Sequence, residues 1–172
     1  MYDEVDRIAR TGDTVKLERA LADMKDKFAR TTYAQQAGLL AAKVYVEAGK
    51  IDAAKSALGW VAESSADEAY QAIARLRLAG VLAQAKAYDD AMKLLSSAFP
   101  QEFAGLASDR RGDLLMLQGK RTEAKAAYEL AYKALDERAE YRRLVEVKLN
   151  ALGVDPRPAV QAAAPASSGE NK

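Results

Sequence analysis

The sequence has no cysteine and no histidine among its 172 residues. These absences exclude disulfides, zinc and iron–sulfur sites ligated by Cys or His, and nucleophilic catalysis of the Ser-His-Asp or Cys-His type. They also remove the side chain best suited to proton transfer at neutral pH. Carboxylates, Lys, Arg and Tyr remain as possible catalytic groups, but the sequence shows no constellation of them. We therefore expect a protein that is not an enzyme and that binds no cofactor and no metal.

An excess of one charge and long apolar runs are lacking as well. The 26 Lys and Arg residues are balanced by 25 Asp and Glu residues, whereas binding to nucleic acid requires a basic excess on one face. We expect no nucleic-acid partner. No stretch approaches the roughly 18 consecutive apolar residues of a membrane span. The polar start Tyr2-Asp3-Glu4 contains no secretory signal.

Residues that break helices are scarce, with 4 Pro and 10 Gly, while 37 residues are Ala. Because Ala has the highest helix propensity, the chain is predicted to be all-α. Its length suits one domain with a core of its own. The sequence pattern predicts nine helices, over residues 2–11, 13–29, 31–48, 51–63, 67–85, 88–98, 101–118, 121–135 and 137–152.

A short pattern recurs in three places along the chain. Residues 48–54, 85–91 and 118–124 align without gaps, and their final alanines are 37 and 33 residues apart. These spacings bracket the 34-residue period of the tetratricopeptide repeat. Twelve positions before each final alanine stands a small residue, and four positions after it a large one, in the pairs Ala42 and Leu58, Ala79 and Leu95, and Gly112 and Tyr128.

These repeats predict a tetratricopeptide-like right-handed superhelix of antiparallel helix pairs. We expect the repeats at about 35–66, 72–100 and 105–136, and an amphipathic capping helix at about 137–152. Residues 154–172 differ, because they hold three of the four prolines together with Ala, Ser and Gly. Such a composition buries too little apolar area to fold, so the helical domain is predicted to span residues 1–153 and to end in a disordered tail.

Repeat domains of this kind bind partners along a concave surface formed by the first helix of each repeat. Repeat positions 2, 5, 9 and 12 give the candidate protein-binding residues Leu39, Lys43, Val46, Ile73, Leu76, Leu106, Asp109, Asp113 and Met116. Most are apolar, which suits an apolar peptide or a partner helix. The alternative, which with only three repeats is favoured for most of these residues, is that the leading helices at 2–11 and 13–29 fold back and fill this groove, so that the residues are ordinary core.

Several charged and aromatic residues also have a structural interpretation. Asp109 and Asp113 lie four residues apart on one helical face and could form an acidic site, but beside Arg110 and Arg111 we expect local ion pairs. Trp60, the sole tryptophan, is expected to pack between repeats. A basic group could contact lipid headgroups, but the glutamates interleaved with it favour a solvated, internally paired face. Its members are Arg138, Arg142, Arg143 and Lys148.

The C-terminal third carries two further marks. Phe103 precedes an Ala-rich helix with the run Asp109-Arg110-Arg111-Gly112-Asp113, and the last helix ends in Lys148-Leu149-Asn150-Ala151-Leu152. In both, the chain resembles the YfgM-type family of tetratricopeptide proteins, described as ancillary subunits of the SecYEG translocon. The family patterns are Asp-x-Arg-Gly-Asp/Glu and Lys-Ile/Leu-Asn-Asn-Leu, and Ala151 departs from the second Asn. The resemblance covers roughly residues 1–152.

This resemblance implies a short cytoplasmic N-terminus, one transmembrane helix and a periplasmic repeat domain, of which this chain would be the last. The domain would lie on the periplasmic side of the bacterial inner membrane, attached through an anchor upstream of Met1. It would link the SecYEG translocon to periplasmic chaperones. The residues leave open a soluble tetratricopeptide adaptor of the periplasm or cytoplasm, for example in cell-envelope or cell-division complex assembly, with no translocon role.

Overall fold

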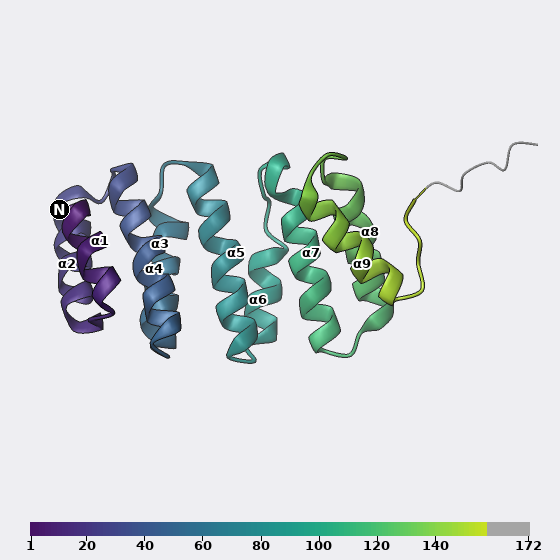
Figure 1. Cartoon of the computed structure of the whole chain (residues 1–172), viewed down its shortest axis with the longest axis horizontal. Coiled ribbons are helices and arrows are strands. Elements are labelled where there is room, and N and C mark those ends of the chain that lie inside the picture. The colour runs from purple at the N-terminus through teal and green to yellow at the C-terminus, as the bar shows by residue number, and fades with distance from the viewer. Residues whose placement is uncertain (158–172) are drawn as a thin grey trace, which may run out of the picture.

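The computed structural model describes residues 1–157, in which nine helices and no strand are present (Figure 1). They are α1 (Tyr2–Thr11), α2 (Thr14–Phe28), α3 (Thr32–Glu47), α4 (Ile51–Ser64), α5 (Glu68–Gln84), α6 (Tyr88–Leu95), α7 (Gln101–Leu117), α8 (Arg121–Ala134) and α9 (Glu140–Ala151). The predicted all-α fold and its nine helices are confirmed. The predicted tail falls mostly on residues 158–172, outside the described part of the chain.

Two helix boundaries differ from the prediction by three residues, and the others agree with it to within one residue. α6 ends at Leu95 rather than at residue 98, because the Ser97 hydroxyl donates to the Leu94 carbonyl at 2.6 Å and Arg75 donates to the Ala98 carbonyl at 2.8 Å, which hold this segment outside the helix. α9 begins at Glu140 rather than at residue 137, because the Asp136 carboxylate accepts a hydrogen bond from the Arg138 N–H at 2.7 Å. This contact holds a turn before the helix.

Each repeat turns between its two helices at a residue with positive φ. Gly49, Lys86 and Gly119 occupy the same place in the three turns, with φ of 71°, 60° and 75°. Glycine adopts this left-handed conformation freely, whereas the Cβ of Lys86 strains it. Three helices that follow loops begin at a side chain that accepts a hydrogen bond from a backbone N–H of the first turn. These capping residues are Asp13, Thr31 and Asp67.

The helices form pairs that stand side by side in a row, from α1 and α2 at one end to α7, α8 and α9 at the other (Figure 1). In the last pair, Gly112 of α7 lies against Tyr128 of α8, and a Cβ at Gly112 would overlap the tyrosine ring. The equivalent residues Ala42 and Ala79 are buried as well. The small and large residues of the repeat thus mark the places where paired helices cross.

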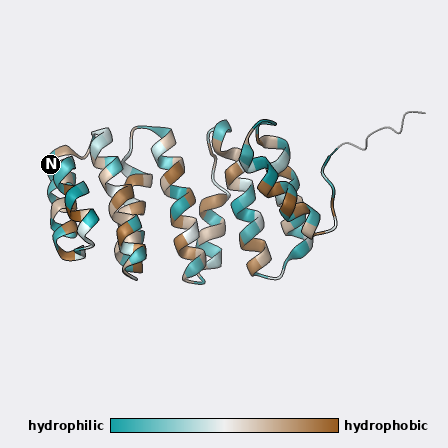
Figure 2. Cartoon of the chain, in the orientation of Figure 1, coloured by the Kyte–Doolittle hydropathy of each residue, from teal (hydrophilic) through white to brown (hydrophobic). Residues whose placement is uncertain are grey.

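Apolar residues recur along the whole row (Figure 2), and the core divides into three clusters. The largest joins α1 to α5 around Leu17 and Leu58, and a second joins α7, α8 and α9 around Val145 and Leu149. Between them a small cluster joins α5, α6 and α7, formed by Ala79, Ala91, Leu95 and Leu114. None of the helices in residues 1–157 combines the length and apolar character that crossing a bilayer requires.

Candidate protein-binding cleft

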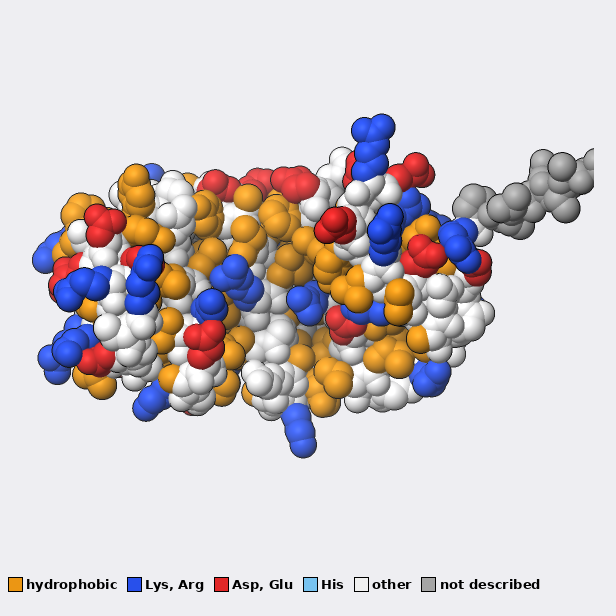
Figure 3. Space-filling view, in the orientation of Figure 1, with side chains coloured by type: hydrophobic (Ala, Val, Ile, Leu, Met, Phe, Trp, Pro, Cys, Tyr) orange, Lys and Arg blue, Asp and Glu red, His pale blue; other side chains and the backbone are white. Residues whose placement is uncertain are grey.

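A cleft of about 590 Å³ lies on the face formed by α3, α5 and α7, the first helices of the three repeats. Figure 3 shows apolar side chains gathered over the middle of this molecule, with Lys and Arg side chains among them. None of the lining residues comes from α1 or α2, which pack against α3 instead. The alternative in which the leading helices fill the groove is therefore wrong for this cleft. Its apolar floor includes Val46, Ile73, Leu76, Phe103 and Leu106.

Five of the nine predicted groove residues line the cleft, namely Lys43, Val46, Ile73, Leu76 and Leu106. The structure places the other four elsewhere. Leu39 is buried in the α1–α5 cluster, and Met116 packs against the α7–α9 cluster. Asp109 is 0% exposed and Asp113 is half-buried, both bonded to α9. For the two aspartates the reason is that Tyr141 and Lys148 of α9 bond to them in the middle of α7.

Among the other lining residues, two arginines and two aromatic residues lie outside the repeat positions used for the prediction. Arg77 and Arg110 occupy the same position in successive repeats, 33 residues apart, so a cation recurring at that position could have identified them. Phe103 lies one turn before Leu106 on α7, and its aromatic side chain at the start of the helix was an available signal. Tyr141 comes from α9. Only the docking of α9 brings it to the cleft.

Positive charge borders the cleft. Three cations line it, Lys43, Arg77 and Arg110, against one carboxylate, Glu47. Lys43 Nζ lies 3.8 Å from Glu47 Oε1, with the side chains 68% and 63% exposed, and such a pair contributes little in water. Among the described residues Arg77 approaches only the Leu39 carbonyl, at 3.5 Å. The cleft thus combines an apolar floor with cations that have weak partners inside the fold.

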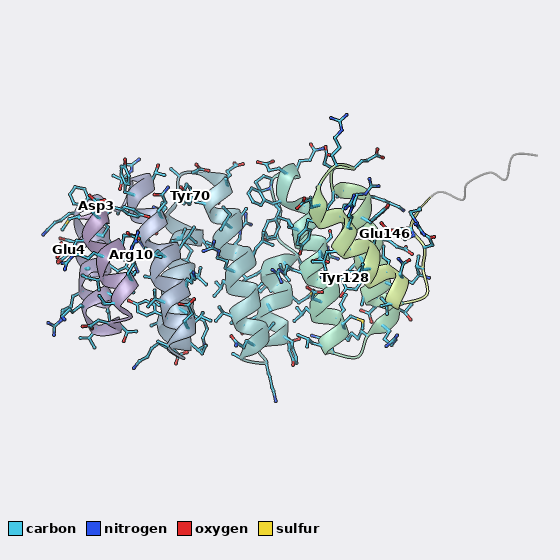
Figure 4. The ribbon with its side chains drawn as sticks, viewed as in Figure 1. Asp3, Glu4, Arg10, Tyr70, Tyr128 and Glu146 are labelled. Atoms are coloured by element: carbon cyan, nitrogen blue, oxygen red, sulfur yellow. The ribbon has the colours of Figure 1, made fainter. Side chains whose placement is uncertain are left out.

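Beside the cleft, a cluster of charges fastens α9 to α7. Lys148 Nζ lies 2.8 Å and 2.9 Å from the two carboxylate oxygens of Asp109 and 2.7 Å from Asp113 Oδ1. The Tyr141 hydroxyl donates to Asp109 at 2.6 Å, and the Tyr128 hydroxyl donates to Asp113 at 2.8 Å. In Figure 4 the labelled Tyr128 lies between α7 and α9. The ammonium and both hydroxyls therefore have carboxylate acceptors.

The expectation of local ion pairs is confirmed only for Arg110, which lies 3.8 Å from Asp113. Asp109 and Asp113 bond chiefly to α8 and α9. Lys148 does not lie on the solvated basic face that was expected, since its side chain is only 22% exposed. Burial, followed by the hydrogen-bonded carboxylate, raises the pKa of the cluster's two tyrosines. Both hydroxyls therefore remain donors at neutral pH, and the cluster holds α9 in place.

The remaining basic and aromatic residues have structural contacts. Arg142 lies 3.6 Å from Glu137 and stacks over the Tyr132 ring at 4.1 Å, which keeps the internal pairing expected of the basic group. Trp60 of α4 packs against the α1–α5 cluster, with Lys25 Nζ of α2 at 4.8 Å from its ring centre. The tryptophan thus lies between the leading helix pair and the first repeat, rather than between two of the three predicted repeats.

Comparison with known proteins places this geometry in a family. The profile of the tetratricopeptide repeat-like domain matches residues 1–154. The chain belongs to this family. The matched region covers nearly all of the described structure, including the leading pair α1 and α2 and the capping helix α9.

Curated relatives share a single name, ancillary SecYEG translocon subunit. The chain is 31% identical over 137 residues to the relative from Neisseria gonorrhoeae, covering 80% of this chain and 66% of that one. It is 30% identical over 132 residues to the relative from Escherichia coli, covering 75% and 64%. The resemblance found in the C-terminal motifs is confirmed. The chain spans less than two thirds of the length of these relatives, and no solved structure matches it.

Proposed function

We propose that this domain is a non-enzymatic scaffold for protein–protein interaction and that it belongs to an ancillary subunit of a SecYEG translocon. The observation that carries the proposal is the open apolar cleft across α3, α5 and α7, with its cationic border. A concave apolar surface of this size is typical of a binding site. The shared name of the relatives supports the translocon as the setting.

The mechanism is scaffolding by a preformed surface. The core clusters and the Lys148 contacts hold the helices that line the cleft, so a partner binds without first ordering this domain. In this proposal the domain lies on the periplasmic side of the inner membrane and links the channel to periplasmic chaperones that receive emerging chains. An upstream anchor would raise its effective concentration beside the channel.

The test is affinity capture from solubilised bacterial envelopes with the full-length protein as bait. Leu106→Asp places a charge on the cleft floor, at a residue that belongs to none of the three core clusters. Val15→Asp makes the same change on α2, where the side chain is 59% exposed, and serves as the matched control. Circular dichroism is the control that would show that both variants fold.

We expect translocon subunits and periplasmic chaperones to copurify with the parent protein and with Val15→Asp, and to be largely lost with Leu106→Asp. Equal recovery with both variants would remove the cleft from the mechanism. If no bait recovers translocon subunits, the translocon setting is refuted and the adaptor alternative takes its place.

A further inference from the structure

The cleft continues beyond Gly80 and Arg110. A second hollow of about 450 Å³ lies on the other side of these residues, among α5, α6 and α7, with Leu114 and Leu117 in its lining. Gly80, Gln84 and Arg110 line both hollows. The two are therefore adjacent parts of one surface, which we name the long groove.

Gly80 lies where the two hollows meet, and no contact inside the fold requires a glycine there. It stands inside α5, and a Cβ built on it would meet no atom within 4 Å. Glycine inside a helix is unfavourable relative to Ala, and one of its uses is to admit another backbone at close range. The space above Gly80 is thus open to an occupant.

Cations border the long groove over its whole length. They are Lys43, Arg77, Lys86 and Arg110. Its two carboxylates are Glu47 and Asp113, and Asp113 is already bonded to Lys148 and to the Tyr128 hydroxyl. An apolar floor with an electropositive border is complementary to a segment that has an apolar row flanked by carboxylates.

We propose that the long groove binds an acidic amphipathic helix of a partner protein. Its apolar side chains enter both hollows, its backbone passes close over Gly80, and its carboxylates face the bordering cations. This inference rests on the proposed function, because it names the chemistry of the segment that the same cleft takes. The chain's own residues 158–172 contain one acidic side chain, Glu170, so charge favours a segment from another protein.

The test uses synthetic peptides of about 20 residues, long enough to form a helix. The first carries Leu along one helical face with Glu on both sides of it. A second replaces every Glu by Lys, and a third has the composition of the first in a scrambled order that breaks the apolar face. Fluorescence anisotropy measures binding to the full chain near physiological salt. We expect the first peptide to bind at least about tenfold more tightly than the other two, and less tightly as salt is raised.

A charge-reversed groove tests the role of the cations. Lys43→Glu with Arg77→Glu changes two bordering residues that lie outside the Asp109 cluster. Lys93→Glu with Arg143→Glu makes the same change in charge at exposed residues outside both hollows. We expect the first variant to lose about tenfold in affinity for the acidic peptide and to gain affinity for the Lys peptide, while the control keeps the parent preference.

A pair of glycine variants tests the path of the occupant. Gly80 and Gly59 both stand inside helices with no atom within 4 Å of a built Cβ, but Gly59 lies outside the long groove. Gly80→Leu should weaken binding of the acidic peptide about tenfold, and Gly59→Leu should leave it unchanged. Both should melt no lower than the parent, since Leu favours the helix. Equal affinity of the two variants would overturn the proposed path.

The outcomes separate this inference from the proposed function. Binding of all three peptides alike, or a preference for the Lys peptide, would overturn it, even if envelope capture still depends on Leu106. Binding of the acidic peptide only after removal of residues 158–172 would make that segment the occupant and would also overturn it. Self-association that Lys43→Glu with Arg77→Glu abolishes, in a chain that does not bind the acidic peptide, would assign the groove to a second copy and would overturn the inference. If Leu106→Asp and Val15→Asp capture the same partners, the proposed role of the cleft as the binding site is refuted.

Discussion

Replacing Lys148 by methionine removes the ammonium from the cluster that fastens α9. Asp109 is 0% exposed and would keep only the hydrogen bond from the Tyr141 hydroxyl. Breaking a buried ion pair from one side costs about 3–5 kcal/mol. Because the Lys148 side chain is 22% exposed and Asp109 retains one donor, we expect the lower end, about 3 kcal/mol. In a domain of this size that corresponds to a fall of about 6–12 °C in Tm.

Urea and thermal unfolding followed by circular dichroism would measure this loss, with Lys133→Met on the exposed face of α8 as control. Adding Asp109→Asn to Lys148→Met should restore part of the stability, because the amide no longer leaves a buried charge without a counter-ion. A loss below about 1 kcal/mol, the value of an exposed pair, would refute the reasoning. So would a double variant less stable than Lys148→Met alone.

Three further changes test other parts of the fold by urea denaturation. Lys86→Gly removes the strain of φ 60° in the second turn and should raise the free energy of unfolding by about 1 kcal/mol; no gain would mean the turn is not strained. Gly112→Ala forces a methyl group against the Tyr128 ring and should lower the free energy of unfolding by about 2 kcal/mol, whereas a neutral result would show that the helix pair can separate there. Because the pKa of Tyr128 and Tyr141 is raised above the usual 10.0 in the folded state, their contribution to stability is complete below pH 10.0 and is lost as the pH rises further; the double Tyr→Phe variant should show a flatter alkaline decline.

The fold was predictable because its determinants are local or periodic. The spacing of the final alanines sets the repeat length, and the small residues twelve positions before them mark helix crossings that the structure places at Ala42, Ala79 and Gly112. Helix ends were harder, since α6 depends on hydrogen bonds at Ser97 and Ala98 and α9 on a turn held by Asp136. Both lie outside the repeat pattern.

The candidate site was predictable only in part, because long-range contacts decide it. Repeat positions selected Val46 and Leu106, which do line the cleft, since these lie on helix faces fixed by the period. The same positions selected Asp109, which bonds to α9, and Met116, which packs against the α7–α9 cluster. The partner of Asp109 is Lys148, 39 residues further on, and no local pattern shows that α9 returns to lie against α7.

Because the middle cluster is small, we expect the molecule to bend more easily between α5 and α7 than at its two ends. Two larger clusters hold α1–α5 and α7–α9, while the cluster that joins α5, α6 and α7 has only four buried side chains, two of which are alanines. In a row of layers that contact only their neighbours, bending concentrates at the layer with the least apolar packing. The long groove crosses this layer. We therefore expect the two ends of the domain to keep their shape while the distance between them adjusts to the segment that the long groove would bind.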